Sequence, residues 1–205
     1  MKRKEELLTQ LDRVIGNCKN CRLWRTASNA VPGEGHAEAV VMFVGEAPGF
    51  HEDRQGRPFV GRAGQLLDKL LARVGLRRED VYITNVVKHR PPENRAPNKD
   101  EVRTCLPYLL RQIQVVNPKV IVPLGRFALE IFIKDQTISK VHGQLFKANG
   151  RLVFPLYHPA AALRSESVLH ELEKDFSGLP KVLKGEVKPQ VLENRNGDKN
   201  QLELF

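Results

Sequence analysis

The sequence predicts an α/β fold: one domain with an open, mostly parallel four-stranded sheet and helices on both faces. Short apolar runs alternate along the chain with helical stripes of apolar residues, the pattern of strands joined by crossover helices. A chain of 205 residues, of which 41% are hydrophobic, is also long enough for one well-buried domain and short for two.

Four segments are predicted to be buried strands because they are short and strongly apolar. They are residues 39–44, 81–84, 119–124 and 152–156. A glycine or a polar side chain comes directly or almost directly after each of them, so we expect functional groups at the carboxyl ends of the strands.

Helical spacing of apolar residues predicts helices over 3–15, 63–74, 98–116 and 126–133. Asn98 is suited to cap the third of these helices, and Pro107 is an irregularity inside it. Strands that alternate with helices in this way favour a parallel sheet with helices on both of its faces.

The composition becomes polar from about Gly185, and such a segment cannot bury enough surface to offset its ordering entropy. We therefore expect a domain over residues 1–184 and a disordered tail over residues 185–205. The last five residues, 201–205 (QLELF), are apolar again.

The chain is basic, with 33 Lys and Arg against 24 Asp and Glu, a net charge of +9. This excess favours a polyanionic partner, although it also serves solubility. The first residues are charged and lead into an amphipathic pattern, and no apolar run approaches the ~18 residues of a membrane span. We expect a cytoplasmic protein without membrane contact.

The most informative motif is GEAPG (45–49), which follows the apolar run 39–44. It presents Glu46 where open α/β sheets bind ligands. The nearby loop 56–61 (GRPFVG) offers Phe59 between two glycines. A carboxylate and an aromatic ring on neighbouring loops suit a flat polar ring such as a nucleobase. An ordinary strand–turn–helix connection is the alternative for these residues taken alone.

The three cysteines raise the question of a metal site. Cys18 and Cys21 form a CxxC pair, Cys105 lies far away in the sequence, and His89 would complete a Cys3His set. From spacing alone zinc is the first candidate. A redox pair, a coincidence, or a surface histidine in a basic loop are the alternatives.

Together these segments resemble the family 4 uracil-DNA glycosylases, the iron–sulfur branch of that superfamily, over roughly residues 10–180. The resemblance rests on the order and spacing of Cys-x2-Cys, GEAPG, GRPFVGRAGQLL, VYITNVVKHRPPENR, VPLG and HPAA. It implies the uracil-DNA glycosylase fold and an enzyme of base excision repair that hydrolyses the N-glycosidic bond of uracil in DNA and leaves an abasic site.

The resemblance also implies a [4Fe–4S] cluster with Cys18, Cys21, His89 and Cys105 as its ligands. The family usually has cysteine where this chain has His89. Imidazole replaces thiolate on iron in Rieske centres, so we expect the cluster to persist, with an altered potential. Zinc, or a cluster lost on purification, remains the alternative. The expected role is structural.

By the same resemblance, the flipped base stacks on Phe59, and the Asn85 amide reads the uracil edge. His158 stabilises the uracil anion, and Glu46 orients the attacking water. Ala47 and Pro48 shape the pocket.

Other residues receive roles outside this pocket centre. Leu163 is expected to wedge into the DNA stack. Glu52 and Asp53 are candidates for excluding the methyl group of thymine.

Two other readings stay open at this point. One is a metal-stabilised DNA-binding protein with an inert pocket, and the other is a glycosylase for another deaminated base. The presence of the pocket residues Glu46, Phe59, Asn85 and His158 favours an enzyme over an inert pocket, and details of the pocket would decide which base it prefers.

The C-terminal peptide resembles the short motif by which bacterial repair proteins bind the replication sliding clamp. Gln201 would provide a polar anchor, while Leu202, Leu204 and Phe205 would fill an apolar pocket. The preceding polar segment would act as a tether. Chance is the alternative. We expect a monomer that acts in the cytoplasm of a bacterium, at the nucleoid.

Overall fold

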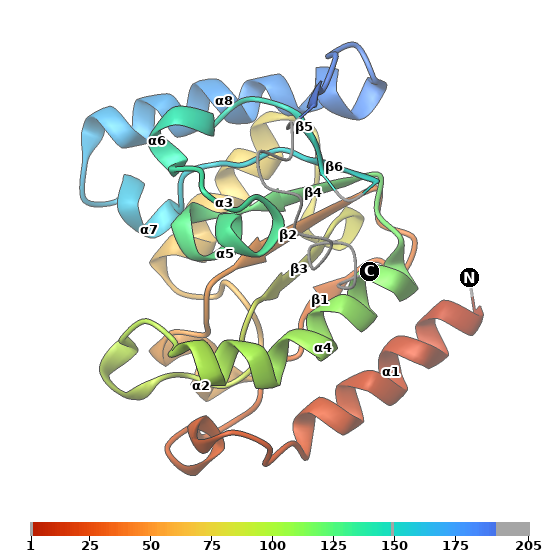
Figure 1. The fold of residues 1–205 in the computed structure, drawn as a ribbon, viewed down its shortest axis with the longest axis vertical. Coiled ribbons are helices and arrows are strands. Elements are labelled where there is room, and N and C mark those ends of the chain that lie inside the picture. Colours follow the sequence, from red (N-terminus) through yellow and green to blue (C-terminus); the bar gives the residue numbers. More distant parts are fainter. Residues whose placement is uncertain (1, 149, 192–205) are drawn as a thin grey trace.

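The computed structural model describes residues 2–148 and 150–191, and their strands form one mixed sheet between layers of helices (Figure 1). The strand order is β1-β3-β2-β4-β6-β5-β7. The strands are β1 (Glu34–Gly35), β2 (Val41–Gly45), β3 (Tyr82–Asn85), β4 (Val120–Pro123), β5 (Phe146–Ala148), β6 (Arg151–Val153) and β7 (Gln190–Val191). The α/β class is confirmed, but the expected number of four strands was wrong. The three additional strands, β1, β5 and β7, have only two or three residues, too few to show a periodic pattern.

The four predicted strands form the parallel centre of the sheet, in the order β3-β2-β4-β6. Strand β2 pairs with β3 on one side and with β4 on the other, so that Val44 lies between Thr84 and Pro123. The added strands β1 and β5 pair antiparallel with β3 and β6, respectively. The fourth predicted strand is shorter than expected and ends at Val153.

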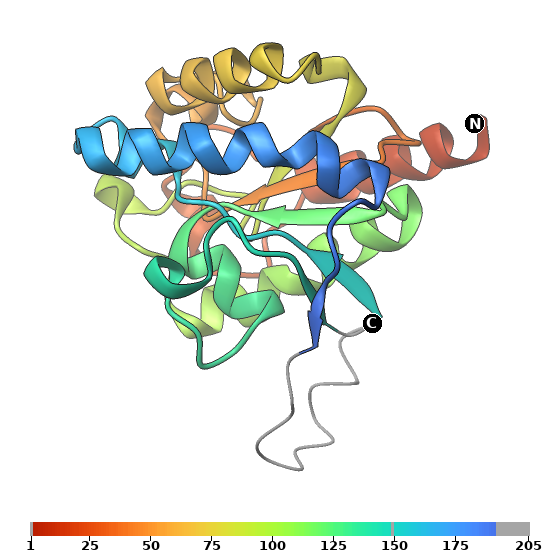
Figure 2. The same ribbon diagram turned by 90° about the horizontal axis from the view of Figure 1, so that it is seen from above.

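Helices cover both faces of the sheet (Figure 2). They are α1 (Lys2–Gly16), α2 (Phe50–Gln55), α3 (Arg62–Arg73), α4 (Lys99–Val116), α5 (Gly125–Phe132), α6 (Ile138–Val141), α7 (Pro159–Ala162) and α8 (Glu166–Lys184), with 3-10 turns η1 (Arg22–Arg25), η2 (Arg78–Asp80) and η3 (Pro92–Asn94). The four predicted helices correspond to α1, α3, α4 and α5. Asn98 caps α4 in a capping box, and its N–H donates to Glu101 at 2.8 Å. The sequence analysis missed α8, although Leu172, Phe176 and Leu179 recur on its buried side at helical spacing.

The alternation of side chains along β2 divides the core into two halves. Met42 and Val44 pack on the side of α4 and α5, whereas Val41 and Phe43 pack on the side of α3 and α8. The Phe43 ring stacks on Phe176 of α8, with centroids 5.7 Å apart. All five residues of β2 are buried, which explains why the run lacks a polar alternation.

The segment expected to be a tail starts differently from the prediction. Gln190–Val191 forms β7 and pairs with β5, so the first residues after Gly185 include sheet structure. The remaining residues, 192–205, with the predicted clamp peptide Gln201–Phe205, lie outside the described part of the chain. Within that part, no helix is long and apolar enough to span a bilayer.

Candidate active site

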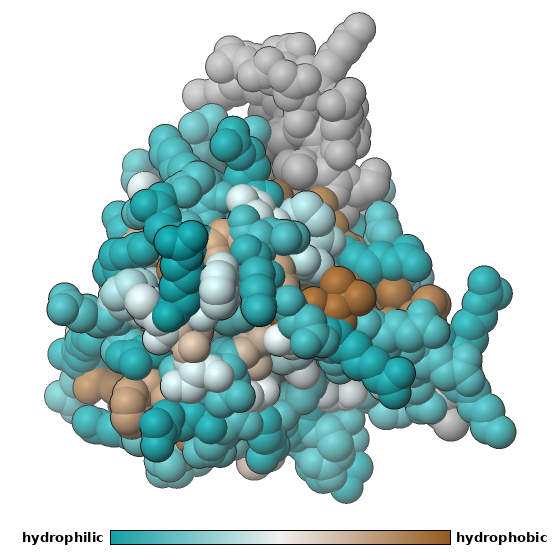
Figure 3. All heavy atoms as spheres, turned by 90° about the horizontal axis from the view of Figure 1, so that it is seen from below, coloured by the Kyte–Doolittle hydropathy of each residue, from teal (hydrophilic) through white to brown (hydrophobic). Residues whose placement is uncertain are grey.

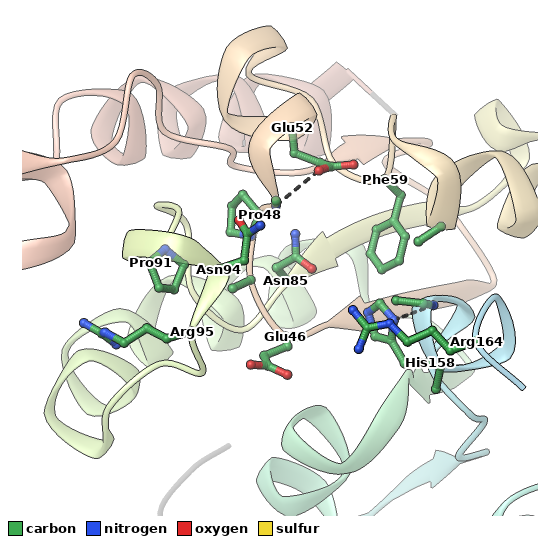
Figure 4. Close-up of a pocket in the computed structure, with 15 residues that line it drawn as sticks. Glu46, Pro48, Glu52, Phe59, Asn85, Pro91, Asn94, Arg95, His158 and Arg164 are labelled. Carbon is green, nitrogen blue, oxygen red and sulfur yellow. Dashed lines mark hydrogen bonds between the residues drawn. The ribbon is translucent and has the colours of Figure 1, made fainter.

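One cavity of about 410 Å³ brings together all six residues predicted to bind the base (Figure 4). These residues are Glu46, Ala47, Pro48, Phe59, Asn85 and His158; Gly49, Glu52, Ala63, Pro91, Asn94, Arg95, Ala160, Ala161 and Arg164 complete the lining. The cavity lies where β2 and β3 end, with His158 arriving from the chain after β6. Since these strands are parallel, their carboxyl ends meet at one edge of the sheet.

The Phe59 ring lines the cavity from a loop that Arg78 binds and that α3 approaches closely. Its backbone is left-handed (φ 52°), a conformation that is uncommon for a non-glycine residue. Arg78 donates to the carbonyl oxygens of Pro58 and Phe59, the second at 3.0 Å. A Cβ on Gly64 would lie 1.7 Å from the Phe59 carbonyl oxygen, so α3 approaches the loop closely. Phe59 is only 5% exposed and also packs in the half of the core on the side of α3 and α8.

Glu52 joins the two loops that carry Glu46 and Phe59. One carboxylate oxygen accepts the N–H groups of Val60 and Gly61 at 2.8 Å, and the other accepts the Gly49 N–H at 3.1 Å. Glu52 thus lines the cavity and fixes its walls (Figure 4).

Asp53, the second candidate for excluding thymine, has a different place. It is buried away from the cavity lining, and one of its oxygens accepts the N–H groups of Ser28 and Asn29 at 2.9 and 3.2 Å. This carboxylate therefore stabilises the loop at residues 28–29 and does not reach the base.

Asn85 is 2% exposed and reaches the cavity over Gly45, its partner in the neighbouring strand. A Cβ on Gly45 would lie 2.3 Å from the Asn85 side-chain oxygen and 2.6 Å from the Phe59 ring. The glycine before Glu46 consequently leaves the space in which the amide and the ring lie side by side.

His158 is the N-cap of α7, and its ring is held in one protonation form. The Ala160 N–H donates to Nδ1 at 3.0 Å, so the neutral ring carries its proton on Nε2 (Figure 4). Burial lowers the pKa of His158 to about 4, which keeps the ring neutral near pH 7. The ring stacks on Phe59 with centroids 5.6 Å apart. The site thus offers a neutral N–H donor.

Glu46 lines the same cavity. Burial raises the pKa of this carboxyl to about 7, and the positive charge of Arg126 opposes the shift. A carboxyl group with a pKa near neutrality is suited to accept a proton and release it again.

Basic side chains line the cavity beside these groups. Arg95 pairs with the buried Glu101 at 2.7 Å, and Arg164 follows Leu163 at the end of α7. Leu163 is 40% exposed. The sequence reasoning gave no role to Asn94, Arg95 or Arg164, although all three lie within or beside the motifs it used.

Comparison with known proteins shows the family of this chain. A family model described as the uracil DNA glycosylase superfamily matches residues 32–177. The chain belongs to this superfamily. It is 46% identical over 200 residues to the type-4 uracil-DNA glycosylase of Saccharolobus solfataricus, covering 91% of this chain and 92% of the relative. The type-4 enzymes of Archaeoglobus fulgidus and Thermotoga maritima are 48% and 46% identical, over 83% and 87% of this chain and 90% and 97% of theirs. The predicted resemblance to family 4 is confirmed.

The three thiols of this superfamily member lie in one region. Cys18 and Cys21 lie between α1 and η1, and Cys105 lies in α4, which packs against α1. The Tyr108 hydroxyl donates to Cys18 Sγ at 3.2 Å, and the Lys88 N–H donates to Cys105 Sγ at 3.3 Å. Burial, with a smaller contribution from the nearby Cys21 and Cys18, raises the pKa of Cys105 to about 11, while the positive charge of Lys88 opposes the shift.

His89, the fourth predicted ligand, is 7% exposed. It directly follows Lys88, whose N–H donates to Cys105 Sγ. No three ligand atoms of this quartet lie within 4.8 Å of one another among the described residues. A single tetrahedral zinc ion with bonds of ~2.3 Å needs such a compact set. A [4Fe–4S] cluster, in which each ligand binds a different iron, takes a wider set of ligands than one zinc ion.

Proposed function

We propose that this protein removes uracil from DNA by hydrolysing the N-glycosidic bond, and that it leaves an abasic site. The observation that carries the proposal is the convergence of Glu46, Phe59, Asn85 and His158 on one cavity at the carboxyl ends of the strands. The target base must leave the helix to enter such a cavity.

Binding of the base follows from two side chains. The uracil ring stacks on Phe59, while the Asn85 amide donates to O4 and accepts from N3–H. Cytosine presents the opposite pattern and would leave the buried amide unpaired, at a cost of ~1–3 kcal/mol. Because Asn85 is 2% exposed, water is poorly placed to compensate for that loss.

Cleavage leaves the electron pair of the C1′–N1 bond on uracil and positive charge on the sugar. The Nε2–H of His158 donates to O2 and stabilises the uracil anion; a preorganised donor of this kind contributes ~3–4 kcal/mol. The Glu46 carboxylate orients a water molecule and accepts its proton as the hydroxyl oxygen bonds to C1′. Its negative charge also favours the cationic sugar.

The decisive experiment incubates the protein with an oligonucleotide that contains one uracil, followed by alkaline cleavage. Strand scission at uracil, with none at thymine or cytosine, is the expected result. Matched oligonucleotides with hypoxanthine test the activity on another deaminated base. Binding of the oligonucleotides without scission would favour the rival reading of a DNA-binding protein with an inert pocket.

We propose that Cys18, Cys21, His89 and Cys105 hold a [4Fe–4S] cluster. Two observations support this assignment: Cys18 and Cys21 act electrostatically on Cys105, and the residue before the buried His89 donates its N–H to Cys105. The cluster would join the end of α1 to α4 and to the loop after β3, and thereby stabilise the strand end that carries Asn85. Its role in this position is structural.

We also propose that the C-terminal peptide binds the replication sliding clamp through Gln201, Leu202, Leu204 and Phe205, and that the protein is a cytoplasmic monomer. An apolar pentapeptide after a polar segment supports the clamp proposal. Deletion of residues 201–205 should abolish clamp binding in a pull-down experiment and leave uracil excision from short oligonucleotides unchanged. Equal clamp affinity of the truncated and full-length proteins would refute the proposal.

A further inference from the structure

Phe50, the first residue of α2, is an aromatic side chain without a place in the core. It is 51% exposed, on a protein whose visible face in Figure 3 is mainly hydrophilic with small, separate hydrophobic areas. Single exposed hydrophobic residues are common on soluble proteins, so exposure by itself carries no meaning. The exposure of Phe50 becomes informative through the residues next to it and through its place relative to the cavity.

A fixed arginine lies over the Phe50 ring. The Arg90 guanidinium carbon is 5.2 Å from the ring centroid, and Arg90 Nε donates to the Asn94 side-chain oxygen at 2.7 Å. Asn94 itself lines the cavity and has a left-handed backbone (φ 54°). The hydrogen bond therefore holds the guanidinium in place, which removes much of the entropy cost of ordering it on binding.

The Phe50–Arg90 pair lies at the rim of the cavity. Gly49 precedes Phe50, Pro91 follows Arg90, and both of these neighbours line the cavity. Figure 4 shows Pro91 and Asn94 on one side of Asn85, whereas His158 and Arg164 lie on the other side. Pro91, which follows Arg90, and Arg164, which follows Leu163, thus lie on opposite sides of Asn85 in this view.

We propose that Phe50 and Arg90 form a stacking platform for the base next to the flipped uridine, on the side away from Leu163. This inference rests on the proposed excision of uracil from DNA. Flipping removes the stacking partner of each neighbouring base, and an aromatic ring with a guanidinium plane replaces it regardless of sequence. The platform should increase the affinity for single-stranded DNA more than the affinity for duplex DNA, because the neighbouring base of a duplex keeps its pairing partner.

The test measures binding of oligonucleotides that contain 2′-fluoro-2′-deoxyuridine, a slowly hydrolysed analogue, by fluorescence anisotropy. Phe50→Ala should weaken binding of the single strand about tenfold, and that of the duplex less, while Phe50→Trp should bind like the parent protein. Arg90→Gln should also weaken binding. The slope of the logarithm of the binding constant against the logarithm of the salt concentration should become less steep by about 1.

Trp24 provides a matched control, since it is 36% exposed and has Lys19 Nζ 5.1 Å above its ring, but does not line the cavity. Trp24→Ala should leave the affinity unchanged. A 2-aminopurine placed on each side of the analogue in turn should be quenched by the platform on one side only, and Phe50→Ala should abolish that quenching.

Parent-like affinity and quenching of Phe50→Ala, or an equal loss of affinity in Trp24→Ala, would overturn the platform. Uracil excision by the parent protein, measured on the same preparations, separates this outcome from failure of the proposed function. If the parent protein excises uracil and Phe50→Ala binds normally, only the platform is wrong.

Discussion

The ammonium nitrogen of Lys88 lies 2.7 Å from the carbonyl oxygen of Asn85. The same nitrogen donates to Thr84 Oγ1 and Gln112 Oε1, both also at 2.7 Å, so each of its three N–H groups has an acceptor. Lys88 is 1% exposed and carries out this role inside the core. A buried cation therefore fixes the end of β3, which carries the Asn85 amide, from the side of the core.

Lys88→Met should lower uracil excision at least tenfold and the free energy of unfolding by ~2 kcal/mol or more, because it removes the charged donor that three buried oxygen atoms share and leaves the Asn85 carbonyl oxygen without this bond. Thr84→Val is the control, since it removes one hydroxyl of this network but leaves the bond between Lys88 and Asn85 possible. Denaturant unfolding and single-turnover kinetics measure the two effects. If both variants lose activity in proportion to their stability, Lys88 does not position Asn85.

Asn85→Ala and His158→Ala should each lower excision at least tenfold, because one removes the base-reading amide and the other the donor to O2. Thermal unfolding and affinity for DNA should change little. His170→Ala, which alters an exposed histidine of α8, serves as the control and should retain full activity. Undiminished excision in both cavity variants would eliminate the proposed site.

Excision should rise with pH through about 7, since Glu46 must be a carboxylate to accept a proton and burial raises its pKa to about 7. His158, with a pKa lowered to about 4, stays neutral over this range and does not limit the rate. The pH dependence of kcat/KM measures the effect. A profile that is flat between pH 5.5 and 8.5 would contradict this role of Glu46.

The same shift has a consequence for stability. The folded protein holds the Glu46 proton up to about pH 7, whereas the unfolded chain releases it near 4.5, so Glu46 makes the fold less stable as the pH rises between these values. Glu46→Gln should therefore melt higher than the parent protein at pH 8, with little difference at pH 4.5, and should lose excision.

Gly45→Ala should reduce excision at least a hundredfold, because a Cβ at this position would overlap the Asn85 amide and the Phe59 ring. Gly178→Ala is the matched control: its Cβ would meet nothing within 4 Å, and it lies inside α8. That variant should be fully active and as stable as the parent protein or more so, by up to ~1 kcal/mol. Titration with free uracil shows whether the Gly45→Ala cavity still binds the base.

His89→Cys should keep iron and acid-labile sulfide at the parent level and slow their loss in air, because thiolate replaces imidazole as a ligand. His89→Ala is the companion variant and should lose iron faster. Metal analysis and the visible absorption spectrum of protein purified without oxygen provide the measurement. A colourless parent protein with one zinc per chain would refute the cluster, and loss of metal from His89→Cys would show that His89 is not a ligand.

The sequence by itself predicted the parallel centre of the sheet and the residues that meet at its edge. Glu46, Asn85 and His158 follow apolar runs, and the carboxyl ends of parallel strands must share one edge, so local pattern was sufficient for their convergence. The short strands β1, β5 and β7 were missed because two or three residues carry no periodic signal and form only against a neighbour already in place.

Only the tertiary structure decided the chemical state of the site. The proton position on His158 depends on the Ala160 N–H, the raised pKa of Glu46 depends on its burial, and the support of Asn85 depends on Lys88 inside the core. The Phe59 ring is buried because Arg78 binds two carbonyl oxygens of its loop, and because Gly64 lets α3 approach that loop closely. Electrostatics and burial depend on which groups come close in space, and the order of residues does not contain that information.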